Sequence, residues 1–269
     1  MNALSPISVL FGSARRAVEF IGGVGLLLRD TLAATGTALF AKRGRRMGWR
    51  NLWAQMDRVG VQSVPIVSLV LFCIGAILAL QMAPILRDYG MVSKVADVIA
   101  IAVFRELGPL MAAIVLTGFA GASIAAEMGT TVVSEEIEAL TAHAIDPVRF
   151  LVVPRVIATA VMLVCVAVVG DLLGVLGGMV VGQAFLGLGY EQYIHHTFDA
   201  LKLRDFITGL AKASVFGIVI SSLACYLGLG VTGGAQGVGR ATTRTVVLTI
   251  VALIAIDLVF NAVFFYLGL

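Results

Sequence analysis

The chain has 269 residues, of which 59% are hydrophobic and 13% are charged, and its mean hydropathy is +1.02. These values exclude an ordinary soluble globular protein and a disordered chain, and they are typical of an integral membrane protein. The net charge of +3 does not indicate a nucleic-acid partner, and the three cysteines, all within apolar stretches, are too few for a disulfide scaffold.

Residues 1–62 form a basic segment ahead of the first long apolar stretch. Arg15, Arg16 and Glu19 interrupt the apolar residues between 7 and 28, so this stretch is not a cleavable signal peptide. We predict a helix that lies at the membrane interface, and the alternative is a helix packed on the protein itself. Other residues that suit an interface are two tryptophans one helical turn apart and five basic residues that would face anionic lipid: Trp49, Trp53, Lys42, Arg43, Arg45, Arg46 and Arg50.

Residues 63–269 contain five long apolar stretches with few charges. About 20 apolar residues cross a bilayer as a helix, and the alternating pattern of membrane strands is absent. The sequence therefore predicts an all-α integral membrane protein with a five-helix transmembrane domain. The predicted spans are residues 63–83, 98–126, 151–184, 206–228 and 246–267.

Lysine and arginine are unevenly distributed around these spans. With the N-terminus inside the cell, the cytoplasmic segments hold thirteen of the 19 basic residues, and the opposite loops hold four. The positive-inside rule therefore predicts a cytoplasmic N-terminus. Because the number of spans is odd, the C-terminus is expected on the other side of the membrane.

Several predicted spans carry ionisable residues. Arg105 and Glu106 lie in the second span and Lys212 lies at a comparable depth in the fourth, while Asp171 is in the third and Asp257 in the fifth. A charge inside a membrane costs roughly several kcal/mol unless it is paired or hydrated, so these residues are functional candidates. The alternative is that they only pair with one another and hold the helices together.

Two patterns concern the shape of the spans. Gly108-Pro109 predicts a kink in the second span, because proline removes a backbone donor and clashes with the preceding turn. Gly170-x-x-x-Gly174 and Gly178-x-x-x-Gly182 predict close helix contacts along the third span.

The loop between the second and third spans predicts a short helix outside the bilayer, over about residues 134–143. Ser134 is the expected N-cap, Glu135 and Glu136 suit the first turn, and Asp146-Pro147 is typical of the start of the next helix. A helix of this length is not stable alone. It packs either on its own bundle or on a soluble partner.

Other motifs predict no chemistry. The G-x-G-x-x-G pattern at 228–233 lacks the flanking strand of a dinucleotide site, and Arg240 stands where a phosphate loop needs lysine, so we expect a tight turn between two spans. His143, His195 and His196 do not have zinc-ligand spacing, and no nucleophile or metal motif is present in the sequence. The sequence predicts neither a catalytic site nor a metal site.

Six motifs occur in one order along the chain, and they lie at 75–81 (G-x-x-L-x-L-Q), 105–109 (R-E-L-G-P), 121–129, 135–140, 146–155 and 239–244. Together they resemble the MlaE/YrbE-type permeases of lipid-transporting ABC systems that work with MCE-domain proteins. The resemblance covers the chain from about residue 50.

The resemblance implies a homodimeric permease in the inner membrane of a Gram-negative bacterium, where it would serve outer-membrane lipid homeostasis. A heterodimer with a similar permease stays open. A cytoplasmic ATPase would bind each copy and carry ATP and magnesium, and this chain would hold no cofactor. The other implied partners are a periplasmic hexamer of MCE domains, phospholipid and, in some systems, a small cytoplasmic STAS-type subunit.

The resemblance also implies site residues. An outward-facing lipid cavity at the dimer interface would be lined by Leu78, Gln81, Arg105 and Glu106, with Tyr89 just beyond the first span. Arg105 would meet a phosphate, and Glu106 would orient Arg105 or Lys212. The short helix would couple to the ATPase through Ser134, Glu135, Glu136, Ile137, Glu138, Leu140 and His143.

Three other functions are compatible with parts of the sequence. A secondary transporter or channel would use Arg105, Glu106, Lys212 and Asp257 as an ion or proton relay. A lipid-modifying membrane enzyme would need clustered Asp or His residues at a membrane face, and the sequence has no such cluster. An assembly subunit would anchor the MCE ring without conducting lipid.

Overall fold

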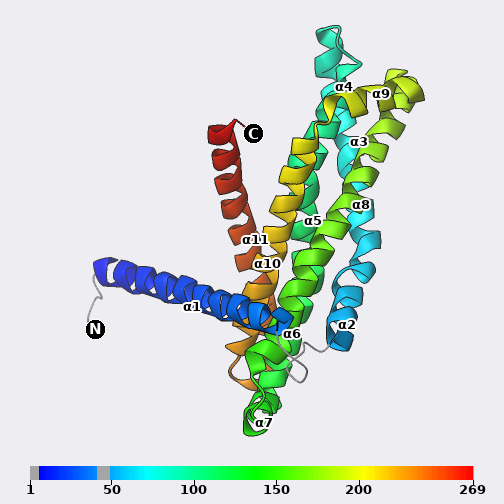
Figure 1. Cartoon of the computed structure of the whole chain (residues 1–269). Coiled ribbons are helices and arrows are strands. Elements are labelled where there is room, and N and C mark those ends of the chain that lie inside the picture. The colour runs from blue at the N-terminus through cyan, green and yellow to red at the C-terminus, as the bar shows by residue number, and fades with distance from the viewer. Residues whose placement is uncertain (1–5, 41–48, 269) are drawn as a thin grey trace.

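The computed structural model describes residues 6–40 and 49–268, and within them the chain is built of helices joined by turns, without a β-strand (Figure 1). The predicted all-α class is confirmed for these residues. Four of the basic residues that we expected to face anionic lipid lie outside the described residues: Lys42, Arg43, Arg45 and Arg46.

Among the residues that the structure describes, five helical stretches are long and apolar enough to cross a membrane, which confirms the five predicted spans. Each begins before its predicted first residue, because the helix continues into a polar flank. The spans are Trp49–Asp88, Lys94–Val133, Val148–Leu186, Leu203–Leu229 and Gly234–Leu267.

The first two spans are composed of several helices. The first span contains α2 (Trp49–Val59), a 3₁₀ turn (Val61–Ser63) and α3 (Val64–Asp88). The second contains α4 (Lys94–Ala102), α5 (Gly108–Leu116) and α6 (Ala122–Val133), joined by π-helical turns at Val103–Leu107 and Thr117–Gly121. The first π-helical turn directly precedes Gly108-Pro109, so the helix is distorted where proline predicted a kink.

The remaining spans are more regular. The third begins with a π-helical turn (Val148–Val152) and continues as α8 (Val153–Leu186), the fourth is α10 (Leu203–Leu229) and the fifth is α11 (Gly234–Leu267). In the described part of the chain, three helices lie outside the spans, namely α1 (Pro6–Phe40), α7 (Glu136–Ala142) and α9 (Tyr190–Ala200). Helices α7 and α9 mark opposite ends of the bundle (Figure 1).

Helix α8 forms the centre of the bundle. It packs on α3 on one side and on α10 on the other, while α11 packs on α10 and α6. The largest buried cluster is contributed mainly by α3, α5, α6, α8 and α10, with one residue each from α2 and α11, and its Leu71, Leu163 and Phe216 are fully buried. In a membrane such contacts stabilise by close packing, because lipid tails are as apolar as leucine.

Glycine permits the close approach of α3 and α8, as the first glycine pattern predicted. A Cβ atom on Gly75 would overlap the carbonyl oxygen of Gly174, and one on Gly177 would overlap that of Phe72. The glycines of the second pattern, Gly178 and Gly182, instead face the ring of Tyr193 on α9. Both patterns therefore mark close contacts, but with different neighbours.

The glycine-rich stretch between the fourth and fifth spans is a turn, as predicted. Helix α10 ends at Leu229 and α11 begins at Gly234, after Gly233 in the left-handed conformation with φ of +84°. Glycine adopts this conformation without strain. The G-x-G-x-x-G pattern thus connects two helices and follows no strand.

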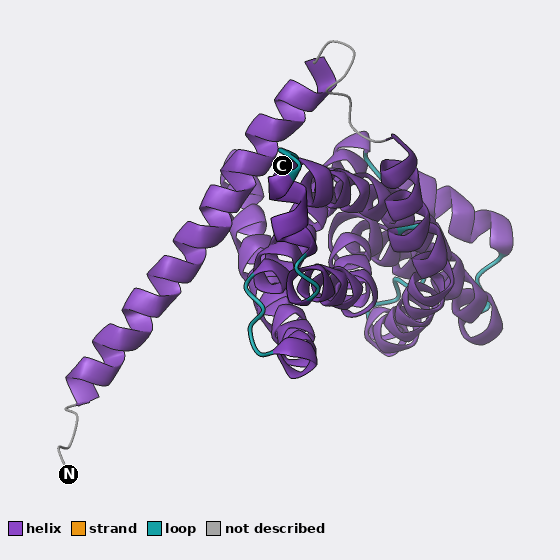
Figure 2. Ribbon diagram, turned by 90° about the horizontal axis from the view of Figure 1, so that it is seen from below, coloured by secondary structure: helices purple, strands orange, loops and turns teal. Residues whose placement is uncertain are grey.

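Helix α1 lies across the other helices. It runs nearly perpendicular to the spans in Figure 1, and Figure 2 shows it passing along one side of the bundle, with its N-terminal half projecting beyond. It contacts α10, α8 and the π-helical turn before α8. The ring of Phe20 meets that of Tyr226 edge to face, with 5.4 Å between centroids. Part of α1 therefore packs on the protein, while its orientation suits a helix in the membrane plane, so the interfacial location stays a prediction.

Candidate functional site

A buried polar cluster joins the second, fourth and fifth spans. The ammonium of Lys212 donates hydrogen bonds to Glu106 Oε2 at 2.6 Å and to Oδ1 of both Asp257 and Asn261 at 2.9 Å. The amide of Asn261 in turn donates to Glu106 Oε1 at 2.9 Å and to Asp257 Oδ2 at 3.2 Å. We call these four residues the Lys212 cluster. It brings together three residues that we predicted, Glu106, Lys212 and Asp257.

The Lys212 cluster is closed on one side and open on the other. The side chain of Lys212 is 0% exposed and that of Asp257 is 9% exposed, whereas Glu106 is 31% exposed. The ring of Phe264 lies 5.9 Å from the ammonium and adds a favourable contact to the cation. With Asn261, the ammonium and the two carboxylates satisfy one another's hydrogen-bonding groups. The cluster is therefore an internally paired polar site whose partly exposed members are Glu106 and Asn261.

Asn261 completes the Lys212 cluster but was not among the predicted site residues. It lies four residues after Asp257 on the same helix, and this spacing places both side chains on one face. The sequence signal was an amide one turn from an intramembrane acid. This spacing is common in helices, so it would have identified Asn261 as a site residue only if a cation such as Lys212 were known to lie opposite Asp257.

Arg105 points to a different partner from its neighbour Glu106. Its Nη1 lies 3.4 Å from Oδ1 of Asp205, whose other carboxylate oxygen accepts a hydrogen bond from the backbone nitrogen of Lys202 at 3.3 Å. Asp205 thereby binds Arg105 and the start of α10 together, and its sequence signal was an acid in the first turn of a helix. Of the two partners that we expected for Glu106, Arg105 or Lys212, the structure shows Lys212.

Asp171 does not belong to the Lys212 cluster. Its side chain is almost fully buried on α8, and its Oδ1 has no hydrogen-bond partner among the described residues. This oxygen lies against Gly108, where a side chain on the glycine would overlap it. The alternative in which Asp171 pairs with the other intramembrane charges is therefore not seen among the described residues, because α8 directs this side chain against Gly108 at the start of α5.

The residues predicted to line a lipid cavity from the first span have different surroundings. Leu78 is half-buried against a small apolar cluster that includes Val95 and Ile99 of α4. Gln81 and Tyr89 are exposed. Their role in lining a lipid cavity therefore stays a prediction.

Helix α7 stands apart from the bundle. It follows directly on α6, which is the element it mainly contacts, and none of its residues is buried. Ile137 and Leu140 are half-buried, and the acids of the segment face outward. The predicted short helix is confirmed, and its location at the tip of the molecule is plain in Figure 1.

The start of α7 differs from our prediction. Ser134 is not its N-cap, because Ser134 ends α6 and donates its hydroxyl to the carbonyl of Thr130 at 2.8 Å. Glu135 precedes the helix in the left-handed conformation, and α7 begins at Glu136. By contrast, Asp146 Oδ1 accepts a hydrogen bond from the backbone nitrogen of Val148 at 2.9 Å, so it caps the third span as predicted.

A second polar network joins α2, α6 and α8 near the α7 end. The carboxylate of Glu127 binds Arg58 of α2 and accepts a hydrogen bond from Nη2 of Arg155 at 3.0 Å. Arg155 also donates to the carbonyl of Leu151 at 2.7 Å. We call Arg58, Glu127 and Arg155 the Glu127 network. Sequence reasoning assigned it no role, although Glu127 and Arg155 both lie in motifs that carried the resemblance.

The opposite end of the bundle is held by α9 on α4. His196 Nδ1 lies 3.3 Å from Oδ1 of Asp97, while His195 pairs with Asp199 of its own helix. Tyr193 is buried, and burial raises the pKa of its hydroxyl. The described residues contain no group of three or more side chains that could hold a metal ion.

The chain matches the family described as Permease MlaE over residues 52–263. It is 40% identical to a probable ABC transporter permease protein of Rickettsia felis, over 93% of this chain and 95% of the relative, and 42% identical to one of Rickettsia typhi, over 72% and 74%. The intermembrane phospholipid transport system permease protein MlaE of Haemophilus influenzae is 29% identical, over 93% of this chain and 99% of the relative.

The matched residues contain the polar features described above. They include the Lys212 cluster, the Glu127 network and α7, together with nearly all of the five spans. Relatives that align over most of both chains carry the name ABC transporter permease. The chain is therefore a multi-pass membrane protein that belongs to the MlaE family of ABC transporter permeases.

Proposed function

We propose that this chain moves phospholipid between a bacterial inner membrane and a periplasmic MCE-domain protein, as the dimeric permease of an ABC system. A cytoplasmic ATPase binds α7 and supplies the energy, and an MCE-domain hexamer receives or delivers lipid at the α9 end. The observation that carries the proposal is α7, a seven-residue helix that projects from the bundle with no buried residue.

Helix α7 is better suited to a partner than to its own bundle. A helix of this length is unstable in isolation, so it needs contacts that the bundle does not provide. Its outer surface combines the half-buried Ile137 and Leu140 with the exposed acids Glu136 and Glu138. An apolar centre with a charged rim is the usual composition of a protein interface, and the acids would meet basic residues of the ATPase.

The coupling path starts at α7 and enters the bundle through α6. Helix α6 is bound to α2 and α8 by the Glu127 network, so a shift of α7 acts on three spans at once. ATP binding biases the bundle between conformations only to the extent that the ATPase binds one conformation more tightly. This chain holds no cofactor and hydrolyses no nucleotide.

A second copy of the chain would complete the lipid cavity. Only 17% of the most apolar stretch of the fifth span and 28% of that of the first are buried, against 61% for the fourth. Large apolar side chains such as Leu69, Val251 and Leu258 are exposed on these helices. Pairing of two copies through such faces would enclose acyl chains, with Gln81, Tyr89 and Leu78 at the wall. The open side of the Lys212 cluster and Arg105 would then meet the headgroup.

The proposed orientation rests on charge. The uneven distribution of lysine and arginine along the sequence supports a cytoplasmic location for α7 and the N-terminus and a periplasmic location for the C-terminus. The phospholipid substrate is supported by the name of the Haemophilus influenzae relative. In this arrangement α9 faces the MCE hexamer, and a STAS-type subunit would bind on the ATPase side.

The coupling assignment is tested by releasing the ATPase. We expect the triple variant Glu136→Lys, Glu138→Lys, Leu140→Ala to lose the co-purifying ATPase while the permease still inserts. The matched control is the exposed pair Glu191→Lys and Phe198→Ala on α9 at the other end of the bundle. Retention of the ATPase by the α7 variant would reject the assignment.

The lipid path is tested at Glu106. Glu106→Gln keeps a hydrogen-bond acceptor for Lys212 but removes one charge, so we expect a stable complex with strongly reduced lipid transfer between vesicles and a reconstituted complex. Arg50→Gln, an exposed arginine of α2 outside both the Lys212 cluster and the Glu127 network, serves as the control. Transfer that requires a proton gradient and no ATPase would instead support a secondary transporter.

A further inference from the structure

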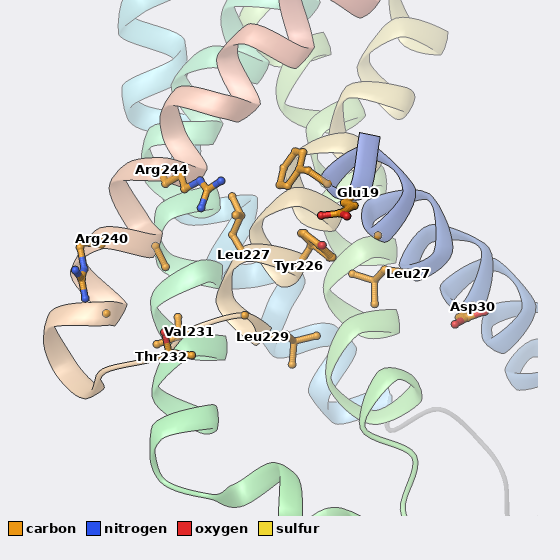
Figure 3. A pocket seen from close by; sticks show the side chains of 15 residues that line it. Glu19, Leu27, Asp30, Tyr226, Leu227, Leu229, Val231, Thr232, Arg240 and Arg244 are labelled. Carbon is orange, nitrogen blue, oxygen red and sulfur yellow. The ribbon is translucent and has the colours of Figure 1, made fainter. Parts of the chain in front are cut away.

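A cavity of about 990 Å³ lies between α1, the end of α10 and the start of α11 (Figure 3). None of its lining residues belongs to the Lys212 cluster or to the Glu127 network. Its lining includes residues of the turn that joins α10 to α11, and this turn lies toward the α7 end of the bundle (Figure 1). This cavity, which we call the α1 cavity, is therefore separate from the sites described above.

The walls of the α1 cavity are apolar on the side of α1 and α10. Phe20 and Leu27 of α1 face Leu227 and Leu229 at the end of α10, and the edge-to-face contact of Phe20 with Tyr226 closes one side. Glu19 and Asp30, at the two ends of the α1 wall, are eleven residues apart, so the cavity extends along α1 by about 16 Å at 1.5 Å per residue. This length suits an extended hydrocarbon chain.

The charges that line the α1 cavity do not cancel one another. Glu19 is bound to Arg15 at 2.8 Å and Asp30 to Arg29 at 3.0 Å, so α1 neutralises its own acids. Arg240 and Arg244, one turn apart on α11, have no ion-pair partner among the described residues. The cavity therefore offers two free guanidinium groups to an anion.

The two arginines have different positions in the α1 cavity. Arg244 directs its guanidinium toward Leu227, while Arg240 lies at the rim, over the turn (Figure 3). The Nη2 atom of Arg240 would lie 3.5 Å from a Cβ atom on Gly233. Beyond Arg244, residues 245–256 carry no charge, so Arg244 marks the boundary at which a membrane helix passes from headgroups into hydrocarbon.

We propose that the α1 cavity binds an anionic glycerophospholipid of the cytoplasmic leaflet. The phosphate lies on Arg244, with Arg240 at the rim, and an acyl chain lies against Phe20, Leu27 and Leu227. Guanidinium groups bind phosphate through paired hydrogen bonds, and the apolar walls exclude water around the chain. The proposal uses the membrane orientation given above but not the transport function, because a lipid can bind here whether or not the complex transfers lipid elsewhere.

The test is site-resolved photolabelling of the full-length complex in phosphatidylcholine nanodiscs. One preparation contains photoreactive phosphatidylglycerol and the other contains photoreactive phosphatidylcholine, and labelled peptides are mapped by mass spectrometry. We expect phosphatidylglycerol to label peptides of α1 and of the end of α10 in clear excess over phosphatidylcholine. Equal labelling by the two lipids would overturn the proposal, and this comparison needs no variant.

Variants then locate the headgroup. Because a basic residue near an anionic lipid surface strengthens binding by about fivefold, we expect Arg244→Gln with Arg240→Gln to weaken the labelling by up to about twenty-five-fold. Arg244→Gln alone should have the larger part of the effect. Arg50→Gln, an exposed arginine of α2 outside the α1 cavity, should leave labelling unchanged. Undiminished labelling in the double variant would contradict the proposal.

Two competing ligands give different results. If inorganic phosphate displaces the photoreactive lipid from these peptides, the α1 cavity binds a soluble anion and the lipid assignment is wrong. If the double variant keeps its labelling but loses the co-purifying ATPase, the arginines bind protein and the proposal fails. Normal lipid transfer by a variant that has lost the label would leave the proposed transport function intact while supporting the α1 cavity as a separate site.

Discussion

The Lys212 cluster and α7 use charge in opposite ways. In the Lys212 cluster, two carboxylates and an amide surround one buried ammonium, and every partner comes from the chain itself. In α7, acids face outward from a helix that has no buried residue. A charged side chain inside the membrane must be paired within the protein, because no water is available there. A charged side chain at the tip is hydrated and is free to bind a partner protein.

Because of this difference, we expect substitutions in the two regions to change different properties, namely the stability of the chain and its affinity for a partner. Substitutions in the Lys212 cluster act on the stability of the isolated chain, since they leave buried groups unpaired. Substitutions in α7 change the affinity of the chain for its proposed partner, the ATPase. A variant in one region should therefore change the free energy of unfolding and leave partner binding intact, and a variant in the other region should do the reverse. Four sets of variants follow, from the largest expected effect on stability to the smallest.

The largest loss is expected for Lys212→Met. Two carboxylates would then face each other without a cation, which we expect to lower the free energy of unfolding by about 3–5 kcal/mol. Chemical unfolding of the purified chain in detergent measures the change. Adding Glu106→Gln and Asp257→Asn removes the stranded charges and should recover most of the stability; a triple variant no more stable than Lys212→Met would contradict the pairing.

A smaller loss is expected for Glu127→Ala. Arg155, whose side chain is 9% exposed, would lose its carboxylate, at a cost of about 2–3 kcal/mol. Arg58 is half exposed, so Arg58→Ala should cost less than about 1 kcal/mol. Thermal unfolding of both variants shows which one loses more stability. Equal losses would show that the buried pair of Glu127 with Arg155 does not stabilise the chain more than the pair with Arg58.

Close helix packing provides the third comparison. Gly75→Ala places a methyl group against the backbone of Gly174, so we expect α3 and α8 to separate slightly at a cost of about 1–2 kcal/mol. Gly25→Ala on α1 meets open space and should stabilise by up to about 1 kcal/mol through helix propensity. Opposite signs in the unfolding temperature would confirm the contact, and a neutral Gly75→Ala would argue against it.

The smallest effect on the isolated chain is expected for Leu140→Ala. Because α7 has no buried residue, the free energy of unfolding of the isolated chain should change by less than about 0.5 kcal/mol. In the complex, the same change should weaken ATPase binding by about tenfold, as for a side chain at the centre of an interface. Titration of the ATPase onto the permease in nanodiscs measures this. A large loss of stability without the ATPase would mean that α7 packs on its own bundle.

The amino-acid sequence by itself determined the membrane class, the five spans, the short external helix and the turn at the glycine-rich stretch. These features depend on local composition over about 20 residues or fewer, because crossing a bilayer requires a continuous apolar helix. Asp146 as a cap and the distortion near Pro109 are local in the same sense. The first residue of α7 was misjudged because Ser134 can equally end one helix or begin the next.

Only the tertiary structure decided how the intramembrane charges pair. Lys212 meets Glu106 and Asp257 across 106 and 45 residues of chain, and Arg105 turns away from Glu106 to bind Asp205. Each choice depends on how α10 and α11 are rotated against the second span, which hydropathy does not specify. The same holds for Asp171, left alone against Gly108, and for Glu127, which joins three spans. The sequence shows which charged residues lie within the membrane spans. Which of them pair depends on the depth and the rotation of helices that are distant in sequence, and only the tertiary structure determines these.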